Sequence, residues 1–380
     1  MKDFMFSVPQ KVIYGAKSLN KLPELLKNDS LKKVLIISGP NLNKMGTVGK
    51  VAELLKEAGI SCAIFTEVEA NPSVETVDKA TKVYKESEAE AIVALGGGSP
   101  MDVAKTVGVL ARYGGSVTQY EGADKVPGAI VPLIAIPTTA GTGSEVTAFS
   151  VITDHSRNYK LTIFSYQIIP SHAILDPELL VSLPASVAAA TSVDALVHAI
   201  EAYLSLDASP FSDAMAEKAM ELLGANIRAF TANRKDLEAG AAMLTGQMFA
   251  GIAFAWARLG DVHAMAHPLS GFFDVSHGVA NAILLPVVLK FNALADKGRY
   301  NKIYQYLTGH TAEQFKPEML VETVRKLTVS LGLPQTLSEV GVKEDEIPAM
   351  AADAMKSGNI AVNPRSTTQK EVEALYHEAM

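Results

Sequence analysis

The chain has 380 residues, of which 48% are hydrophobic and 20% are charged, so it is long enough for two domains and apolar enough to fold. Its formal net charge of -7 gives no general attraction for phosphate backbones or anionic lipids, which disfavours nucleic acid and membrane surfaces as partners. Because Cys62 is the single cysteine, an internal disulfide and a thiolate metal cluster are excluded, as is typical of a reducing compartment. The first ten residues contain no apolar run that resembles a signal peptide, so we expect a cytoplasmic protein.

Short β-branched runs alternate with longer periodic segments in the first half of the chain. The expected strands are residues 34–38, 63–67, 91–95 and 130–136, with further short strands at 149–153, 161–164 and 172–175. The expected helices are residues 48–58, 74–86 and 100–111. Strands that are apolar throughout and alternate with helices indicate a parallel sheet covered on both faces.

The second half of the chain has a different pattern, since Ala-, Leu- and Met-rich segments with helical spacing dominate it from residues 185–204 and 213–231 onward. We therefore predict an α/β domain at residues 1–183 and an all-helical domain at residues 184–380. We expect these domains to pack directly and to leave a ligand-binding cleft.

One segment of the helical half, residues 239–257, carries no formal charge and is about long enough to span a bilayer. Gly and Ala dominate it, and Gln247 lies in its middle. This composition favours a helix buried within the protein over a membrane span.

A glycine-rich turn follows the expected strand at residues 91–95. Residues 96–100 read Gly-Gly-Gly-Ser-Pro, and backbone N–H groups without side chains can approach an anion such as a pyrophosphate at the start of a helix. Ser99 as N-cap, Pro100 at the first helical position and Asp102 also form a capping pattern, so a well-capped helix is the plainer alternative. The spacing matches neither GxGxxG nor the Walker loop.

A second loop, residues 137–145, combines hydroxyl side chains with glycines after another expected strand. Such a surface can hydrogen-bond a ribose, a phosphate or a carboxamide. An ordinary Ser/Thr-rich turn is the alternative.

Histidines and a carboxylate recur at helical spacing in the second half. Asp194 and His198 are four residues apart, as are His263 and His267, while His277 precedes Gly278 at the expected start of another helix. Neutral imidazoles and a carboxylate suit iron(II) or zinc, whereas isolated buried histidines usually bond to backbone groups. The spacing leaves open which of His263 and His267 is a ligand.

These segments resemble the iron-containing, or group III, alcohol dehydrogenases, which share a fold with dehydroquinate synthase and glycerol dehydrogenase. The resemblance covers nearly the whole chain. Its most specific segments are GGGSPMDVAK at 96–105, PTTAGTGSEVT at 137–147, DALVHAIEAY at 194–203 and HAMAHPLSGFFDVSHGVANAILLP at 263–286. It implies a Rossmann-like dinucleotide-binding α/β domain, a helical domain, one divalent metal ion and a homo-oligomer with a dimer as its minimal unit.

The resemblance also assigns candidate site residues. The implied metal ligands, for iron(II) by family default or for zinc, are Asp194, His198, His263 and His277. The implied cofactor-binding residues are Gly39, Asn71, Gly96, Gly97, Gly98, Ser99, Asp102, Thr138, Thr139, Thr142, Thr147, Phe149 and Lys160. Among these, residues 96–99 would hold the pyrophosphate, and Phe149 would border the nicotinamide.

The activity that the resemblance implies is hydride transfer between a nicotinamide cofactor and a short aliphatic aldehyde or alcohol, which makes the chain an oxidoreductase. The metal ion would polarise the aldehyde oxygen, and His267 would relay the alcohol proton as the catalytic imidazole. One alternative is a lyase or cyclase of the dehydroquinate synthase kind, which uses the same cofactor and metal. A silent binding protein that keeps only the fold is a second alternative.

Two departures from the family pattern bear on specificity. Gly39 stands where many relatives have an acidic residue that bonds the ribose 2'-hydroxyl, so NADP is less disfavoured than usual. We still expect NAD, because no Arg or Lys stands beside Gly39 to bind a 2'-phosphate. Phe254, Trp256 and Arg258, with Phe149, would line a rebuilt substrate pocket.

Arg258 itself has two interpretations. It could bind an anionic tail on the substrate, or it could form an ion pair with Asp261. At the other end of the chain, the apolar, alternating residues 4–14 are expected to pair across subunits.

Overall fold

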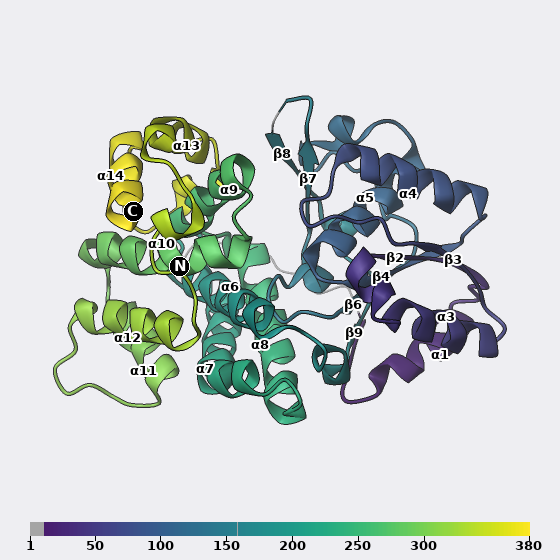
Figure 1. Cartoon of the computed structure of the whole chain (residues 1–380), viewed down its shortest axis with the longest axis horizontal. Coiled ribbons are helices and arrows are strands. Elements are labelled where there is room, and N and C mark those ends of the chain that lie inside the picture. Colours follow the sequence, from purple (N-terminus) through teal and green to yellow (C-terminus); the bar gives the residue numbers. More distant parts are fainter. Residues whose placement is uncertain (1–10, 158) are drawn as a thin grey trace. The chain divides into compact units, whose positions relative to one another are not determined.

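The computed structural model describes residues 11–157 and 159–380, which fall into two compact units (Figure 1). The helical unit contains Ala140–Gly143 and Val181–Met380, and the α/β unit contains the other described residues up to Leu180. The short stretch Ala140–Gly143 thus belongs with the helices, although the sequence-based division assigned it to the N-terminal domain.

A six-stranded, fully parallel sheet forms the centre of the α/β unit. Its strands run in the order β1-β9-β6-β4-β2-β3. They are β1 (Lys11–Tyr14), β2 (Lys33–Ser38), β3 (Ser61–Phe65), β4 (Ala91–Gly96), β6 (Leu133–Pro137) and β9 (His172–Leu175). The helices of this unit are α1 (Leu22–Asn28), α2 (Pro40–Lys44), α3 (Thr47–Glu57), α4 (Val74–Glu86) and α5 (Gly98–Tyr113).

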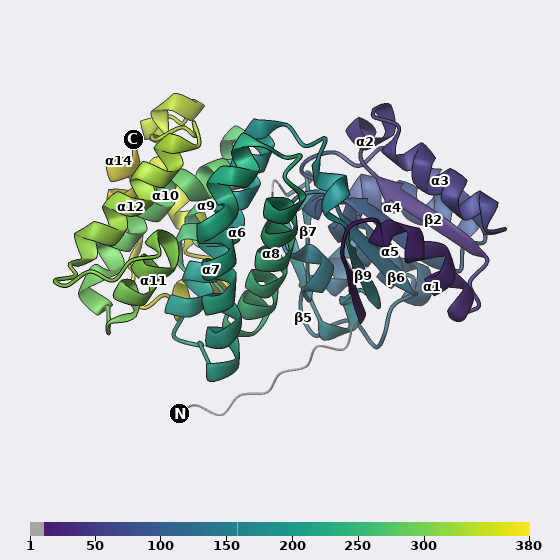
Figure 2. The same cartoon turned by 90° about the horizontal axis from the view of Figure 1, so that it is seen from below.

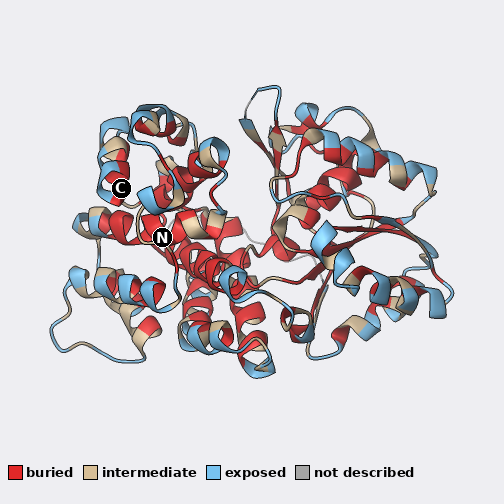
Figure 3. Ribbon diagram, viewed as in Figure 1, coloured by how far each residue is buried: buried red, intermediate tan, exposed pale blue. Residues whose placement is uncertain are grey.

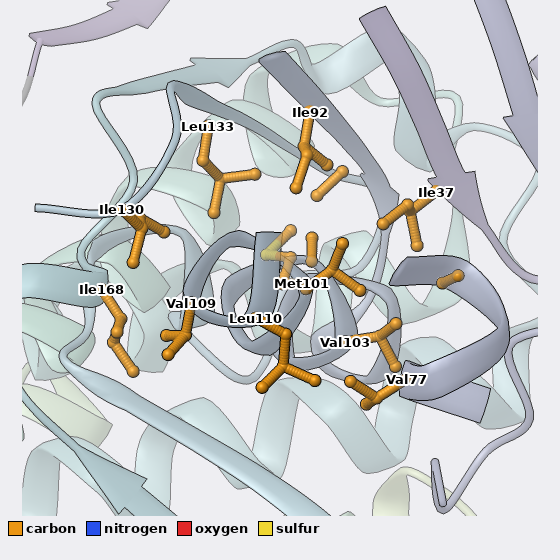
Figure 4. Packing of buried hydrophobic residues seen from close by; sticks show 14 of the residues in the cluster. Ile37, Val77, Ile92, Met101, Val103, Val109, Leu110, Ile130, Leu133 and Ile168 are labelled. Atoms are coloured by element: carbon orange, nitrogen blue, oxygen red, sulfur yellow. The ribbon is translucent and has the colours of Figure 1, made fainter. Parts of the chain in front are cut away.

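The inner strands of this sheet are buried on both faces. Successive side chains of a strand point to opposite sides, so each strand contributes to two cores. In β2, Leu35 and Ile37 belong to the core that also contains Val77 of α4 and Met101 of α5 (Figure 4). The alternate residues Val34 and Ile36 join a second core with side chains of α1 and α3. The predicted α/β fold with a covered parallel sheet is confirmed.

Two of the predicted short strands form a sheet of their own. β7 (Phe149–Asp154) and β8 (Tyr159–Phe164) pair antiparallel, and the two-residue β5 (Gly122–Ala123) joins β8. Along β7, Ser150, Ile152 and Asp154 are buried, while the residues between them are partly exposed. Such alternation is typical of an antiparallel sheet that has one face covered by protein and the other face exposed to solvent.

The ends of some elements differ from the predicted ones. The strand expected at 130–136 begins at Leu133, directly after Pro132, which has no backbone N–H to donate to a ladder. Of the N-terminal stretch expected to pair across subunits, Lys11–Tyr14 is β1 and pairs with β9 of the same chain, whereas Phe4–Gln10 lie outside the described residues.

The helical unit consists of α-helices, with short 3-10 turns in some of the connections between them. They are α6 (Ala185–Leu204), α7 (Pro210–Ala232), α8 (Leu237–Ala257), α9 (Asp261–Phe273), α10 (His277–Asn292), α11 (Arg299–Thr308), α12 (Pro317–Ser330), α13 (Ile347–Ala354) and α14 (Gln369–Ala379). α6, α7 and α8 pack against one another (Figure 2), and α6 and α9 both pack against α10. The predicted all-helical second half is confirmed.

Within residues 11–157 and 159–380, three helices are long and apolar enough, by length and composition alone, to cross a membrane: Ala185–Leu204, Leu237–Ala257 and His277–Ala295. In the folded chain, 83%, 67% and 67% of their most apolar windows are buried (Figure 3). Most of the residues in these windows are therefore buried in the folded chain.

Candidate functional site

Three helices of the helical unit bring a carboxylate and imidazoles together. Asp194 lies on α6, His263 is the third residue of α9, and His277 is the first residue of α10. Their ligand atoms all lie within 4.8 Å of one another. Asp194 Oδ1 is 3.7 Å from His263 Nε2 and 3.8 Å from His277 Nε2.

His198 lies beside this group, one helical turn after Asp194, without belonging to the mutually close set of three. Its Nε2 is 4.0 Å from Asp194 Oδ1. The His198 ring stacks on His263 on one side and on Phe254 on the other, each with a centroid separation of 4.5 Å. Burial lowers the pKa of His198 to about 4, so the ring is neutral at neutral pH and has a nitrogen lone pair available for an ion.

The donor set fits a divalent ion. Ligand atoms about 2.1 Å from a tetrahedral ion lie roughly 3.4 Å apart, so the separations of 3.7–4.0 Å need to contract by only a few tenths of an ångström. Burial opposes ionisation of Asp194, but the surrounding imidazoles outweigh it and hold its pKa well below the usual range. A carboxylate and imidazoles are ligands that suit iron(II) and zinc, and an imidazole binds the ion after losing the proton from its binding nitrogen.

Glu201, which the sequence analysis did not single out, supports this donor set from behind. Its Oε2 lies 2.6 Å from His263 Nδ1, and its Oε1 accepts a hydrogen bond of 2.7 Å from the Val262 backbone N–H. A carboxylate on Nδ1 keeps the proton on that nitrogen and leaves the Nε2 lone pair for an ion. A Cβ on Gly260 would lie 2.9 Å from Glu201 Oε1, so a side chain there would push this carboxylate away.

The sequence did contain a signal for Glu201. It follows Asp194 by seven residues and His198 by three, which places all three on one face of α6. A carboxylate that is only 5% exposed in an Ala-rich helix needs buried partners.

His267 lies one turn beyond His263 on α9. Its ring stacks on the His277 ring at a centroid separation of 5.4 Å and an interplanar angle of 18°. His267 is thus a half-buried neighbour of the donor set, while His263 faces both Asp194 and Glu201.

The segment at the end of α8 does not contain the alternative ion pair between Arg258 and Asp261. Arg258 terminates α8 with φ = 63°, its guanidinium donates to the Gly358 carbonyl, and its Nη1 is 3.9 Å from Asp207 Oδ2. Asp261 begins a new helix, α9, and accepts a hydrogen bond of 2.5 Å from the Thr367 hydroxyl. Because Arg258 caps the end of α8 and Asp261 starts a new helix, their spacing of three does not bring them together. Trp256 lies half-buried near the end of α8.

In the α/β unit, the glycine-rich turns lie at a topological switch point. β2 and β4 are neighbours, while the chain continues from β2 to β3 on one side and from β4 to β6 on the other. Gly39 follows β2 and Gly96 ends β4, so their turns meet at the carboxyl edge of the sheet, where such folds bind ligands. Gly96 has φ = 153°, and a Cβ there would lie 2.7 Å from Pro100 Cγ.

The predicted cap of α5 was wrong. The N-cap is Gly97 and the helix begins at Gly98, so Ser99 lies inside the first turn. The Ser99 hydroxyl instead donates to the Ala70 carbonyl at 2.6 Å. This frees the N-terminal backbone of α5 from a side-chain cap, which leaves its N–H groups for an anion.

The lysine at the end of the GGGSPMDVAK segment, Lys105, is the centre of a buried charged cluster. Lys105 is fully buried, and its Nζ donates to Ser144 Oγ (2.9 Å), Thr147 Oγ1 (3.3 Å) and the Phe149 carbonyl (2.8 Å). Asp102 accepts hydrogen bonds from the Ser144 hydroxyl (2.8 Å) and the Val151 N–H (3.1 Å). The carboxylate of Asp102 thus binds protein groups, and the cluster ties α5 to the residue 144–151 segment.

Burial dominates the ionisation of this cluster. It lowers the pKa of Lys105 to about 8, although Asp102 and Glu145 partly offset the effect. Burial also raises the pKa of Glu145 to about 7. Asp102 and Glu145 thus favour the charged form of Lys105, and Lys105 favours the charged form of each of them.

The remaining candidate cofactor residues occupy several positions. Lys160 donates to Asn71 Oδ1 at 2.9 Å, which brings these two together. The Thr138 N–H donates to the Gly96 carbonyl at 2.9 Å, and Thr139 lies beside Gly97. Phe149 begins β7 and packs on Phe164, whereas Thr142 belongs to the helical unit.

Comparison with known proteins identifies the family. The model for iron-containing alcohol dehydrogenases matches residues 9–177, and the model for the C-terminal part of the Fe-containing alcohol dehydrogenase family matches residues 188–380. The chain belongs to the iron-containing alcohol dehydrogenase family. The enzyme class predicted from the sequence, an alcohol dehydrogenase or aldehyde reductase, is confirmed.

Relatives of this family resemble the chain over nearly its whole length. It is 38% identical to 1,3-propanediol dehydrogenase of Klebsiella pneumoniae (99% of this chain, 98% of the relative) and 35% identical to NAD-dependent methanol dehydrogenase of Bacillus methanolicus (99% of both). It is 37% identical to lactaldehyde reductase of Escherichia coli K12 (96% and 97%). A solved 1,3-propanediol oxidoreductase superposes with a TM-score of 0.97 at 38% identity, covering both chains fully. These names support the dehydrogenase interpretation over the lyase alternative.

Proposed function

We propose that this enzyme interconverts short, uncharged aliphatic aldehydes and alcohols with an NAD cofactor, most simply in the reductive direction. The proposed ligands of its divalent ion, for which iron(II) is the family default and zinc the alternative, are Asp194, His198, His263 and His277. The observation that carries the proposal is the convergence of three donors from three helices within 4.8 Å, with His198 beside them.

When bound, the divalent ion would supply Lewis acidity that stabilises negative charge on the aldehyde oxygen, while the nicotinamide supplies the hydride. Glu201 would hold His263 in the tautomer that leaves Nε2 free. Phe254 would shield one face of His198 from water. His267, next to His277, would pass the alcohol proton through its imidazole.

The cofactor proposal rests on the α/β unit. The N-terminus of α5 and the turns around Gly39 and Gly96 supply backbone N–H groups for a pyrophosphate. No Arg or Lys lies beside Gly39 to bind a 2'-phosphate, so we propose NAD as the preferred cofactor. No acidic side chain stands at this position to repel that phosphate, so we propose NADP as an accepted one. Lys160, Asn71 and the threonines at 138, 139, 142 and 147 complete the proposed set.

We also propose a cytoplasmic homo-oligomer with a dimer as its minimal unit. The single cysteine, Cys62, is typical of a reducing compartment and supports the location. β1 has β9 as its hydrogen-bonded neighbour in the six-stranded sheet, and such an edge can pair with another chain.

One experiment tests the main proposal. Purified enzyme is stripped with a chelator, reloaded with iron(II) or zinc under anaerobic conditions, and assayed on a panel of short aldehydes with NADH and NADPH. We expect activity to disappear on stripping, to return with the ion, and to be higher with NADH. Full activity of the stripped protein would contradict the metal site, and a strong NADPH preference would contradict the cofactor assignment.

Replacing His267 by alanine should lower kcat at least tenfold, since the proposed proton path is lost. The metal content should stay at the wild-type value, because His267 contacts the donor set through ring stacking. Metal analysis of the purified variant together with its kcat checks this. Loss of the ion would assign His267 to the ligand set instead.

Replacing Arg258 by alanine should change kcat/KM for anionic and for neutral aldehydes by the same factor, within about twofold. The guanidinium is already engaged by the Gly358 carbonyl and lies near Asp207, so we do not expect it to bind a substrate anion. Paired assays on glyoxylate and on propionaldehyde check this. A selective loss for glyoxylate would restore the anionic-tail hypothesis.

A further inference from the structure

Asn281 lies at the centre of the proposed metal ligands, although neither the sequence nor the family comparison singles it out. It is on α10, one turn after His277, and it is fully buried. Its amide Nδ2 lies 2.6 Å from Asp194 Oδ1, 3.2 Å from His263 Nε2 and 3.3 Å from His277 Nε2. One amide nitrogen thus faces three of the proposed donor atoms.

These three contacts are not equivalent once an ion is bound. An amide NH2 group has two hydrogens, so it cannot donate fully to three acceptors. A ring nitrogen has a single lone pair, which a bound ion takes, so both imidazole contacts would be lost. A carboxylate oxygen has two lone pairs, so Asp194 Oδ1 can bind an ion and still accept from Asn281. The contact that survives binding is also the shortest, at 2.6 Å.

A packing role does not explain this asparagine. Asn281 Oδ1 is buried and, among residues 11–157 and 159–380, accepts no hydrogen bond. An unsatisfied buried amide oxygen is unfavourable, and an apolar side chain of similar volume would avoid that loss. The amide is therefore explained by its N–H groups, which point toward the donor set.

We infer that Asn281 is a positioning residue of the metal centre, whose amide N–H orients Asp194 toward the ion without being a ligand itself. This inference rests on the proposed function, because it needs an ion at Asp194, His198, His263 and His277. It extends the site by a residue that acts through a ligand, as outer hydrogen-bond partners of metal sites commonly do.

The test compares full-length wild-type enzyme with Asn281→Leu and with Asn292→Leu. Asn292 is a matched control, because it is also buried on α10 but hydrogen-bonds Asn363 instead of the donor set. Each protein is stripped and titrated with Co2+ against a chelating dye, and the visible absorption of the Co2+ form is recorded. Thermal unfolding of the stripped proteins reports on folding alone.

We expect Asn281→Leu to weaken Co2+ binding about 10- to 100-fold and to shift the visible bands at unchanged band intensity, since Asp194 is reoriented and no ligand is lost. Asn292→Leu should lower the melting temperature and keep the Co2+ affinity within about twofold. If Asn281→Leu does not fold, Asn281→Ser carries the same expectation, because its shorter hydroxyl cannot reach Asp194.

Three results would overturn the inference. Unchanged Co2+ affinity and spectrum in the Asn281 variant would make it a packing residue. An equal loss of affinity in Asn292→Leu would indicate general loosening of α10. Band intensities that report one ligand fewer would make Asn281 a ligand. If the wild-type protein itself binds no Co2+, the proposed function fails. If the wild-type protein binds Co2+ and the Asn281 variant binds it equally well, only the inference about Asn281 fails.

Discussion

Replacing Glu201 by glutamine should weaken binding of the divalent ion about 10- to 100-fold, the range that removal of an outer-shell carboxylate typically produces. Glu201 accepts hydrogen bonds with both oxygens, from His263 Nδ1 and from the Val262 backbone N–H. A glutamine replaces one of these oxygens with an NH2 group, which then faces another hydrogen-bond donor, either His263 Nδ1 or the Val262 N–H. His263 would lose the partner that keeps Nε2 unprotonated and directed at Asp194.

The measurement is ion affinity by chelator competition, together with kcat at increasing iron(II). We expect the low activity of Glu201→Gln to recover substantially at saturating iron(II), because the four proposed ligands remain. Glu217→Gln is a suitable control, since Glu217 pairs with the Tyr203 hydroxyl in the same unit and contacts no proposed ligand. Wild-type affinity in Glu201→Gln would show that His263 is oriented by the helix alone.

Local sequence patterns were sufficient for most of the fold. The helix predicted at 74–86 coincides with α4, because its apolar residues recur at helical spacing and Ser73 caps its first turn. The buried strands were recognisable since Val34–Ser38 and Ala91–Leu95 are apolar on both faces. The pairing partners of β5, β7 and β8 depend on contacts between distant segments, which periodicity does not encode.

The candidate site was predictable where one helix contains the pattern. Asp194 and His198 share a face of α6, so their spacing was informative. His263 and His267 share a face of α9 as well, so their spacing does not tell them apart. The contact with Glu201 on α6 distinguishes His263, which faces Asp194, from His267, which stacks on His277. Glu201 shares that face of α6 and was recognisable by the same spacing, whereas Asn281 was not, because its partners Asp194 and His263 lie on other helices.

Errors arose where a short spacing crossed a helix boundary. Arg258 and Asp261 are three residues apart, but α8 ends at Ala257, Arg258 has a positive φ, and Asp261 starts α9. The residue at 258 therefore turns toward Gly358, while Asp261 faces Thr367. Spacing arguments hold within one helix and fail when an unrecognised chain reversal intervenes.

Replacing Lys105 by methionine should destabilise the α/β unit by about 3 kcal/mol, because it leaves the buried carboxyl groups of Asp102 and Glu145 without their cation. For a unit of this size, the melting temperature should fall by roughly 6–12 °C. NADH should also bind more weakly, about tenfold, because Thr147 and Phe149 lose the hydrogen bonds that hold their segment against α5. Thermal unfolding and NADH fluorescence titration measure the two effects.

A matched control and a double variant separate charge from packing. Lys82→Met removes an exposed lysine from α4 and should change neither quantity, since its side chain is 74% exposed. Asp102→Asn combined with Lys105→Met should be less destabilised than the sum of the single variants, because removing both members of a buried pair leaves less uncompensated charge. If the losses of stability in the two single variants add up in the double variant, Lys105 acts by packing and by its hydrogen bonds to the residue 144–149 segment. The weaker NADH binding would then follow from loosening of that segment alone.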